Sequence, residues 1–215
     1  CSSDLLLEKE ELSNETAEGY LEVLERQSNR LKKLIEDLIE ASKASTGNLA
    51  VHLEKLEAGV SVVQIVGEFE DKLNAADLTL LIQKPEMPVY VMADGRHFWR
   101  VIDNLMNNIC KYAQPGTRVY VDLRENGGQV ELIFRNTSRY PLNISSEELM
   151  ERFVRGDESR NTEGSGLGIS IAKSLMELMG GSFMLYVDGD LFKVVLGFAQ
   201  MEEEKEPLDE DKIGK

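Results

Sequence analysis

Polar side chains recur along one face of a predicted helix in the middle of the chain. Asn104, Asn108 and Lys111 stand three and four residues apart, and Asn107 adds a further amide between them. Asparagine forms helices poorly, so this concentration on an otherwise apolar helix needs a reason. An amide oxygen suits Mg²⁺, and a lysine one turn on meets phosphate as a point charge. A water-exposed polar face explains the same spacing, so both interpretations stay open.

A second candidate site is a cluster of glycines directly before another predicted helix. Glycine lets the backbone approach a phosphate closely, and the free N–H groups of a helix N-terminus favour an anion. The spacing matches neither the dinucleotide fingerprint nor a Walker loop. Upstream, Arg152, Arg155 and Arg160 lie within residues 137–163, a stretch long enough for a lid over a nucleotide. The cluster consists of Gly164, Ser165, Gly166, Leu167 and Gly168.

The elements that must position these residues are predicted from hydrophobic periodicity and turn signals. The predicted strands are residues 49–53, 78–82, 89–92, 118–123, 130–135, 182–187 and 191–198. Helices are predicted over residues 60–73, 94–113 and 168–179. Hairpin turns are expected at Asn126-Gly127 and at residues 188–190. Helices among mostly antiparallel hairpins indicate an α+β fold, a two-layer sandwich with helices on one face of the sheet.

A long amphipathic helix is predicted ahead of this domain, from an N-cap at Asn14 to a left-handed C-cap at Gly47. Its apolar stripe is wider than that of a two-stranded zipper and suits a four-helix bundle. Residues 4–12 are expected to end a preceding helix, which would make the pair a helical hairpin. The hairpin alone cannot bury this apolar stripe, which predicts a partner. The alternative is a helix packed onto its own domain. The stripe is Leu21, Leu24, Ser28, Leu31, Leu34, Ile35, Leu38, Ile39 and Ser42.

Composition excludes several classes of protein. The chain has 24 Lys+Arg against 39 Asp+Glu, a formal net charge of −15, which argues against nucleic-acid binding. No apolar run is long enough to span a membrane. Cys1 and Cys110 make neither a disulfide framework nor a zinc site, and a reducing compartment fits best. Because the chain begins with Cys1 and shows no signal peptide, we expect a piece of a longer protein.

Together these pieces resemble one family, the sensor histidine kinases of two-component systems. Residues 104–112 resemble its asparagine box, residues 151–155 its phenylalanine box, and residues 164–172 its second glycine box. Residues 30–38 are similar to the second helix of its dimerisation and histidine-phosphotransfer hairpin. The boxes agree in order and spacing, and the resemblance covers nearly all of residues 15–198.

The resemblance implies a fold and a division of the chain. The fold is the two-layer α/β sandwich of the histidine kinase, gyrase and chaperone ATPase type, preceded by a fragment of the dimerisation hairpin. Residues 1–46 would be that partial hairpin, residues 47–200 the ATP-binding catalytic domain, and residues 201–215 a disordered acidic tail.

The resemblance also implies a role for each site residue, with ATP and Mg²⁺ as the bound groups. Asn108 would ligate Mg²⁺ between the ATP phosphates, with Asn104 supporting the site. Lys111 would approach the phosphates and Tyr112 would line the nucleotide pocket. Arg155 would reach the γ-phosphate or help to dock the acceptor helix. The implied nucleotide-binding residues are Asn104, Asn108, Lys111, Tyr112, Asn136, Arg155, Gly164, Ser165, Gly166, Leu167 and Gly168.

The sequence departs from the family pattern in three places. The first glycine box normally reads Asp-x-Gly-x-Gly and its aspartate accepts from the adenine amino group, whereas residues 134–139 contain no glycine and place Asn136 there. An amide oxygen can still accept that hydrogen bond, without the carboxylate's charge. Asp190 and Leu191 stand ahead of the last strand, where the family usually has Gly-Thr. His52 and His97 both lack the context of a phosphoacceptor and are interpreted as surface or packing residues, so the acceptor helix is expected upstream of this chain.

The resemblance implies that the full protein moves the γ-phosphoryl group of ATP to a histidine and then to a response-regulator aspartate. It would be a homodimer through the hairpin, with this domain in the cytoplasm of a membrane-anchored parent. The fragment would bind Mg·ATP without labelling itself. The altered adenine box motivates an alternative, a degenerate member that acts as a dimeric scaffold or regulator. A mismatch-repair, topoisomerase or chaperone ATPase is disfavoured, because Asn104 replaces their water-activating glutamate.

Overall fold

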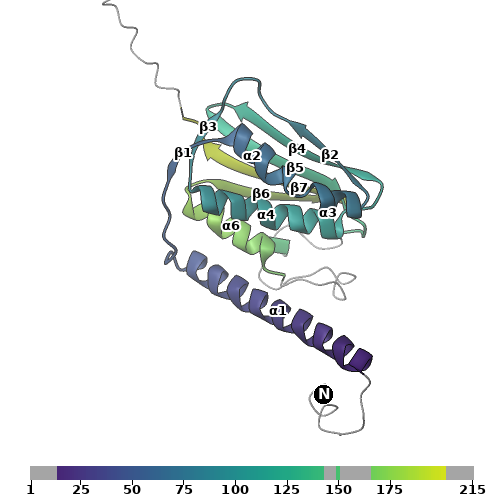
Figure 1. Cartoon of the computed structure of the whole chain (residues 1–215). Helices are drawn as coiled ribbons and strands as arrows, with labels where there is room; N and C mark the ends of the chain where they lie inside the picture. The colour runs from purple at the N-terminus through teal and green to yellow at the C-terminus, as the bar shows by residue number, and fades with distance from the viewer. Residues whose placement is uncertain (1–13, 143–148, 151–165, 202–215) are drawn as a thin grey trace, which may run out of the picture.

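The computed structural model describes residues 14–142, 149–150 and 166–201. A long helix, α1 (Asn14–Ser45), leads into a domain in which helices cover one face of a five-stranded sheet (Figure 1). The predicted two-layer α+β sandwich is therefore confirmed. The remaining elements are β1 (Glu54–Glu57), α2 (Ala58–Gly67), α3 (Glu70–Ala75), β2 (Leu78–Gln83), β3 (Tyr90–Ala93), α4 (Gly95–Tyr112), β4 (Thr117–Asn126), β5 (Gln129–Thr137), α6 (Gly168–Leu178), β6 (Ser182–Asp188) and β7 (Leu191–Ala199).

The large sheet is mixed, with the strand order β2-β4-β5-β7-β6. Strand β2 runs parallel to β4, and the other neighbouring pairs are antiparallel. Strands β1 and β3 form a separate antiparallel pair. Strand β5 lies in the middle of the large sheet, and near its end Asn136 stands opposite Phe192 of β7. The topology thus places one sequence-predicted site residue near the end of the central strand.

The β4–β5 hairpin turns one residue later than the predicted Asn126-Gly127. Asn126 pairs with Gln129, which leaves Gly127 and Gly128 as the two turn residues. Their φ angles are 58° and 81°, the left-handed values that a type I′ turn requires at both positions and that glycine adopts without strain.

The core fills the space between the sheet and the helices. Alternate residues of β5 point inward, and Val130, Leu132 and Phe134 are fully buried. From the helix layer, α4 and α6 contribute buried residues that include Leu105 and Leu175. The two candidate motifs thus belong to helices whose apolar faces are held on the sheet.

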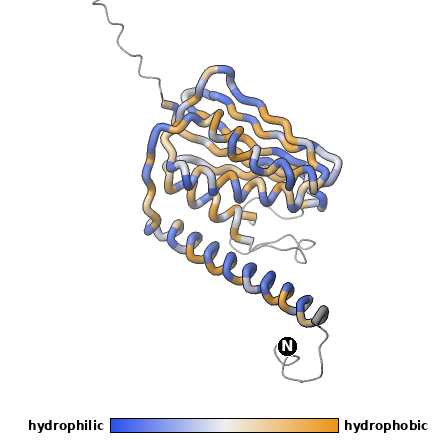
Figure 2. Tube along the Cα trace, viewed as in Figure 1, coloured by the Kyte–Doolittle hydropathy of each residue, from blue (hydrophilic) through white to orange (hydrophobic). Residues whose placement is uncertain are grey.

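Helix α1 ends as predicted. The φ angle of Gly47 is 70°, and the N–H of Asn48 donates to the carbonyl of Lys43 over 3.0 Å. Apolar positions recur among polar ones along the helix (Figure 2), and many of them stay exposed, including Leu21, Leu31 and Ile35. Residues 4–12 and the tail from 202 onward lie outside the described residues. No helix in the described part has both the length and the hydrophobicity to cross a bilayer.

The strand predicted at residues 49–53 was wrong. This segment has no regular structure, and the first strand is β1, where Glu54 pairs with Ala93. The apolar alternation that suggested a strand arises because Leu49 and Val51 pack against the core from an irregular segment. The real strand was missed because its residues Glu-Lys-Leu-Glu carry charges, as an exposed short strand can.

The single helix predicted at residues 60–73 was also wrong, because two helices occupy this region. Glu57 caps α2, so the helix starts earlier than expected: its side chain accepts from the N–H groups of Gly59 and Val60. At the other end, the N–H of Phe69 donates to the carbonyl of Val66 in a tight turn, and Phe69 is buried. Both helices on either side of this turn contribute buried residues to the core.

Candidate functional site

Helix α4 carries the asparagines, and its N-terminus is firmly capped. The carboxylate of Asp94 accepts from the N–H groups of Arg96 and His97 at 3.0 and 3.1 Å, and also from the N–H of His52 at 2.9 Å. Burial raises the pKa of Asp94, but the backbone donors His52 and His97 lower it, and the net pKa lies below its ordinary value. The cap stabilises the start of α4 and ties the segment after α1 to it.

One face of α4 is buried, and the predicted site residues lie on the other side. Phe98, Ile102 and Ile109 are among its fully buried residues, whereas Asn104 and Asn108 are only partly buried. The thiol of Cys110 is also partly buried, and burial raises its pKa, so it stays protonated near neutral pH. The chemistry that α4 offers therefore comes from its amides and from Lys111.

Asn104 joins the asparagine motif to the glycine motif. A Cβ atom placed on Gly168 would lie 3.4 Å from Asn104 Oδ1, so the first residue of α6 packs directly against this amide. The Nδ2 atom of Asn104 is buried and has no hydrogen-bond partner within the described structure. A buried amide donor without a partner costs free energy, which a bound acceptor would recover.

Asn107 and Lys111 of α4 differ in the contacts that their side chains make. Asn107 is fully engaged: Lys72 Nζ donates to its Oδ1 at 3.1 Å, and its Nδ2 donates to the Asp103 carbonyl and carboxylate at 2.8 and 2.7 Å. Lys111 instead lies with its Nζ 5.0 Å from the ring centroid of Tyr112, a cation–π contact. The described residues contain no group of three or more His, Cys, Asp or Glu that could hold a metal. A metal here would depend on amide, phosphate and water oxygens.

Asn136 is 5% exposed and points into the same layer as the buried residues of β5. Its Nδ2 donates to the carbonyl of Thr137 at 3.2 Å, while its Oδ1 is buried without a partner in the described part of the chain. A carbonyl only accepts, so the atom facing Thr137 is the NH₂ group and the free atom is the acceptor. The sequence prediction of an acceptor at this position fits this arrangement.

The end of β5 is hydrogen-bonded to the end of α4 and to the β6–β7 turn. The N–H of Gln114 donates to the carbonyl of Thr137 at 2.9 Å, and the N–H of Arg139 donates to the carbonyl of Tyr112 at 2.8 Å. The N–H of Ser138 donates to the carbonyl of Asp190 at 2.6 Å. The structure therefore brings Tyr112 and Asp190, two residues that the sequence analysis singled out, close to the strand that carries Asn136.

The described part of the glycine motif begins at Gly166, whose φ angle is 72°. Leu167 is fully buried, and Ser170 Oγ donates to its carbonyl at 2.9 Å. Helix α6 starts at Gly168, beside Asn104. Gly164, Ser165, Arg155 and the rest of the phenylalanine box lie outside the described residues, as do residues 143–148 and 151–163 of the predicted lid.

The two histidines have structural surroundings. His52 is exposed and contributes a backbone N–H to Asp94. His97 is 4% exposed, and its Nε2 lies 3.0 Å from the carbonyl of Ala50. This agrees with their interpretation as surface and packing residues.

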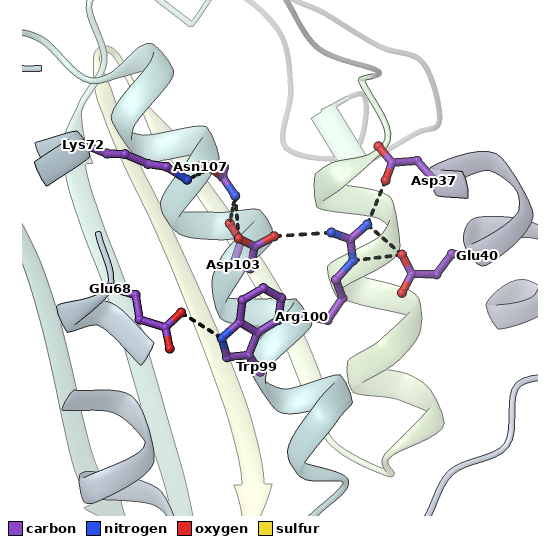
Figure 3. Close-up of polar contacts among 8 residues, drawn as sticks. All are labelled: Asp37, Glu40, Glu68, Lys72, Trp99, Arg100, Asp103 and Asn107. Carbon is purple, nitrogen blue, oxygen red and sulfur yellow. Dashed lines mark hydrogen bonds and ion pairs between the residues drawn. The ribbon is translucent and has the colours of Figure 1, made fainter. Parts of the chain in front are cut away.

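Sequence reasoning missed one cluster, which centres on Arg100 of α4. Its guanidinium binds Asp37 and Glu40 of α1 and Asp103 of its own helix (Figure 3). Two of these partners lie about sixty positions earlier, so no local spacing marks the cluster. The only sequence signal is an arginine one turn before Asn104.

Comparison with known proteins agrees with this geometry. Residues 93–206 match the family model described as histidine kinase-, DNA gyrase B-, and HSP90-like ATPase. The chain belongs to this family. The match starts just before α4 and runs beyond β7, so it spans both candidate motifs and the sheet that positions them.

Curated relatives narrow the assignment to sensor kinases. The chain is 27% identical to the sensor protein IrlS of Burkholderia pseudomallei over 173 residues, 78% of this chain and 36% of the relative. It is 26% identical to the probable sensor kinase SilS of Salmonella typhimurium over 178 residues, 81% of this chain and 36% of the relative. The chain thus spans about a third of the length of these relatives.

Solved structures share the fold. The histidine kinase AdeS of Acinetobacter baumannii matches with a TM-score of 0.72 at 18% identity, over 93% of this chain and 91% of that one. Full-length ShkA, in complex with AMPPNP, matches with a TM-score of 0.73 at 18% identity, over 93% and 42%. ThkA, in complex with the response regulator protein TrrA, matches with a TM-score of 0.66 at 16% identity, over 94% and 56%. These likenesses show the shared fold, and the family match together with the sensor-kinase relatives supports a sensor histidine kinase catalytic domain.

Proposed function

We propose that this domain binds Mg·ATP and supplies its γ-phosphoryl group to a histidine of a longer parent protein, for relay to a response-regulator aspartate. The observation that carries the proposal is a pair of buried amide atoms, Asn104 Nδ2 and Asn136 Oδ1, that have no partner among the described residues. Each unmet group costs about 1–3 kcal/mol. A nucleotide would satisfy both kinds of atom, because its base offers an amino donor and its phosphates offer acceptors.

The remaining residues fit the phosphate end of such a ligand. Asn108 would hold Mg²⁺ through its amide oxygen, and the metal would neutralise phosphate charge. Lys111 would lie near the phosphates and Tyr112 beside the base. The N-terminus of α6 at Gly168 offers N–H groups to an anion. Arg155, Gly164, Ser165, Gly166 and Leu167 complete the proposed site.

Positioning and charge neutralisation carry most of a phosphoryl transfer. Asn104 has an amide where a general base would need a carboxylate or an imidazole, so it orients groups and does not remove a proton from water. This favours transfer to a protein acceptor over hydrolysis. Neither histidine of the chain stands in an acceptor environment, so we expect this fragment to bind nucleotide without phosphorylating itself.

We also propose a location, an oligomeric state and a partner for the parent protein. We expect a cytoplasmic domain of a membrane-anchored homodimer, paired through α1 and a preceding helix, which would cover exposed residues such as Leu21 and Leu31. A receiver domain of a response regulator is the expected partner, as TrrA is for ThkA. The complex of ShkA with AMPPNP supports the expected ligand class.

One observation favours a second candidate, a dimeric scaffold with little turnover. Asn136 is neutral where the family has a carboxylate, and a neutral acceptor makes a weaker hydrogen bond. If this loss prevents nucleotide binding, the domain would act only through its surfaces.

Calorimetric titration with ATP, with and without Mg²⁺, decides between the two. We expect saturable, magnesium-dependent binding that Asn108→Ala weakens on the order of tenfold or more. Asn107→Ala is the matched control, because that amide lies on the same helix but is turned toward Lys72 and Asp103. Absence of binding at millimolar ATP by a folded chain would favour the scaffold.

A further inference from the structure

Arg100 forms a bridge between helix α1 and the ATP-binding domain. Its Nη2 lies 2.7 Å from Asp37 Oδ1 and 2.8 Å from Glu40 Oε2, and its Nε donates to the same Glu40 oxygen at 2.9 Å. Its Nη1 lies 3.3 Å from Asp103 Oδ2. Figure 3 shows the guanidinium between the two helices, with acids on both sides. All three of its nitrogens are therefore used, and two of them hold α1.

The face of α1 that meets the domain is narrow and has small side chains. Asp37, Ala41 and Ala44 are 7%, 2% and 4% exposed and follow one another at helical spacing. Helix α1 contacts α6. Leu34, one turn before Asp37, is half-buried, whereas the other large apolar residues near it, such as Ile35 and Leu38, are exposed. Two alanines and one half-buried leucine bury little apolar area, so packing alone holds α1 weakly. The ion pairs must supply much of the specificity of this contact.

Three carboxylates share the Arg100 guanidinium. Burial lowers the pKa of the Arg100 guanidinium, but Glu40 and Asp37 raise it, and the net pKa lies above its ordinary value. The guanidinium therefore stays charged. Without it, Asp37 and Glu40 of α1 would face Asp103 of α4 as like charges and push the two helices apart. Since the Arg100 side chain is 21% exposed, water can enter and the contact can open.

We propose that Arg100 is a positioning residue that acts as a reversible latch: its ion pairs to Asp37 and Glu40 set the orientation of the ATP-binding domain on α1. When the latch opens, α1 leaves the domain by pivoting at the turn around Gly47. The cap of Asp94, which also holds the N–H of His52, keeps the following segment attached to the domain. The movement is thereby confined to the few residues between α1 and that anchor.

Energy transfer from the single tryptophan can test this latch. Trp99 lies next to Arg100, and an acceptor dye on Ser28→Cys, with Cys1→Ser and Cys110→Ser, labels an exposed position of α1. The labelled chain is diluted with unlabelled chain so that transfer within one molecule is measured. Arg100→Glu should lower the transfer efficiency about twofold or more, because the new carboxylate and Asp103 then face Asp37 and Glu40 as like charges.

Charge reversal separates the latch from a general structural role. Adding Asp37→Lys and Glu40→Lys to Arg100→Glu should restore the transfer efficiency. Arg124→Glu is the control, because that guanidinium pairs with Glu131 inside the β4–β5 hairpin; it should change nothing. Circular dichroism verifies that each variant is folded. Unchanged transfer in folded Arg100→Glu, or a folded triple variant without recovery, would overturn the proposal. Both outcomes are independent of nucleotide binding.

Discussion

The two halves of helix α4 differ in how their polar groups are satisfied. In the N-terminal half, Asp94 accepts three backbone N–H groups and Arg100 uses every guanidinium nitrogen. In the C-terminal half, Asn104 Nδ2 is buried without a partner in the described structure, and so is Asn136 Oδ1 on the neighbouring strand. Buried polar groups are nearly always paired. The first half is therefore complete as it stands, whereas the second leaves the Asn104 amide for the nucleotide that we propose.

Substitutions in the two regions should therefore have opposite effects, and Asn136→Leu should have the largest effect. Leucine removes the acceptor that we assign to the base but has a similar size. Nucleotide affinity should fall on the order of a hundredfold, while the free energy of unfolding stays unchanged or rises, because no unmet acceptor remains. Calorimetric titration and thermal unfolding of the same sample measure both quantities. Unfolding that becomes easier, with binding intact, would show that Asn136 is a packing residue.

Arg100→Leu should give the reverse pattern with a smaller effect. Loss of the guanidinium leaves Asp37, Glu40 and Asp103 without their shared cation, so α1 should leave the domain more often. Amide hydrogen exchange over residues 34–44 should accelerate about tenfold, with little change in the sheet and in nucleotide affinity. If exchange accelerates equally in β5, Arg100 supports the whole domain and the two halves of α4 are less distinct than we infer.

The smallest expected effect is the pH dependence of the stabilisation that the Asp94 cap gives to the folded chain. Its pKa is lowered in the folded state, so its contribution is fully present above the unfolded pKa of about 4 and is lost as pH falls through the lower folded value. Asp94→Ala should cost about 1 kcal/mol of unfolding free energy at pH 7. The cost should shrink below about pH 4. Urea unfolding at several pH values measures it; a difference that is constant with pH would exclude the carboxylate as its source.

Most of the elements were predictable because their signals are local. Gly47, Gly127 and the capping residues mark ends and turns through their own backbone preferences, and the apolar spacing of α4 shows its buried face directly. The two errors have the same cause. Leu49 and Val51 alternate without a partner strand, and a turn at Phe69 divides a continuous apolar pattern. In both cases packing against distant residues decided the local structure.

The sequence by itself determined the family motifs, the asparagine face of α4 and the glycines before α6, because each depends on neighbours within a few residues. Only the tertiary structure decided that Asn104 meets Gly168, that the free atom of Asn136 is its acceptor, and that Arg100 reaches α1. These relations join residues that lie tens of positions apart. They form only in the folded chain, because folding removes these polar side chains from water and fixes which partners each one has.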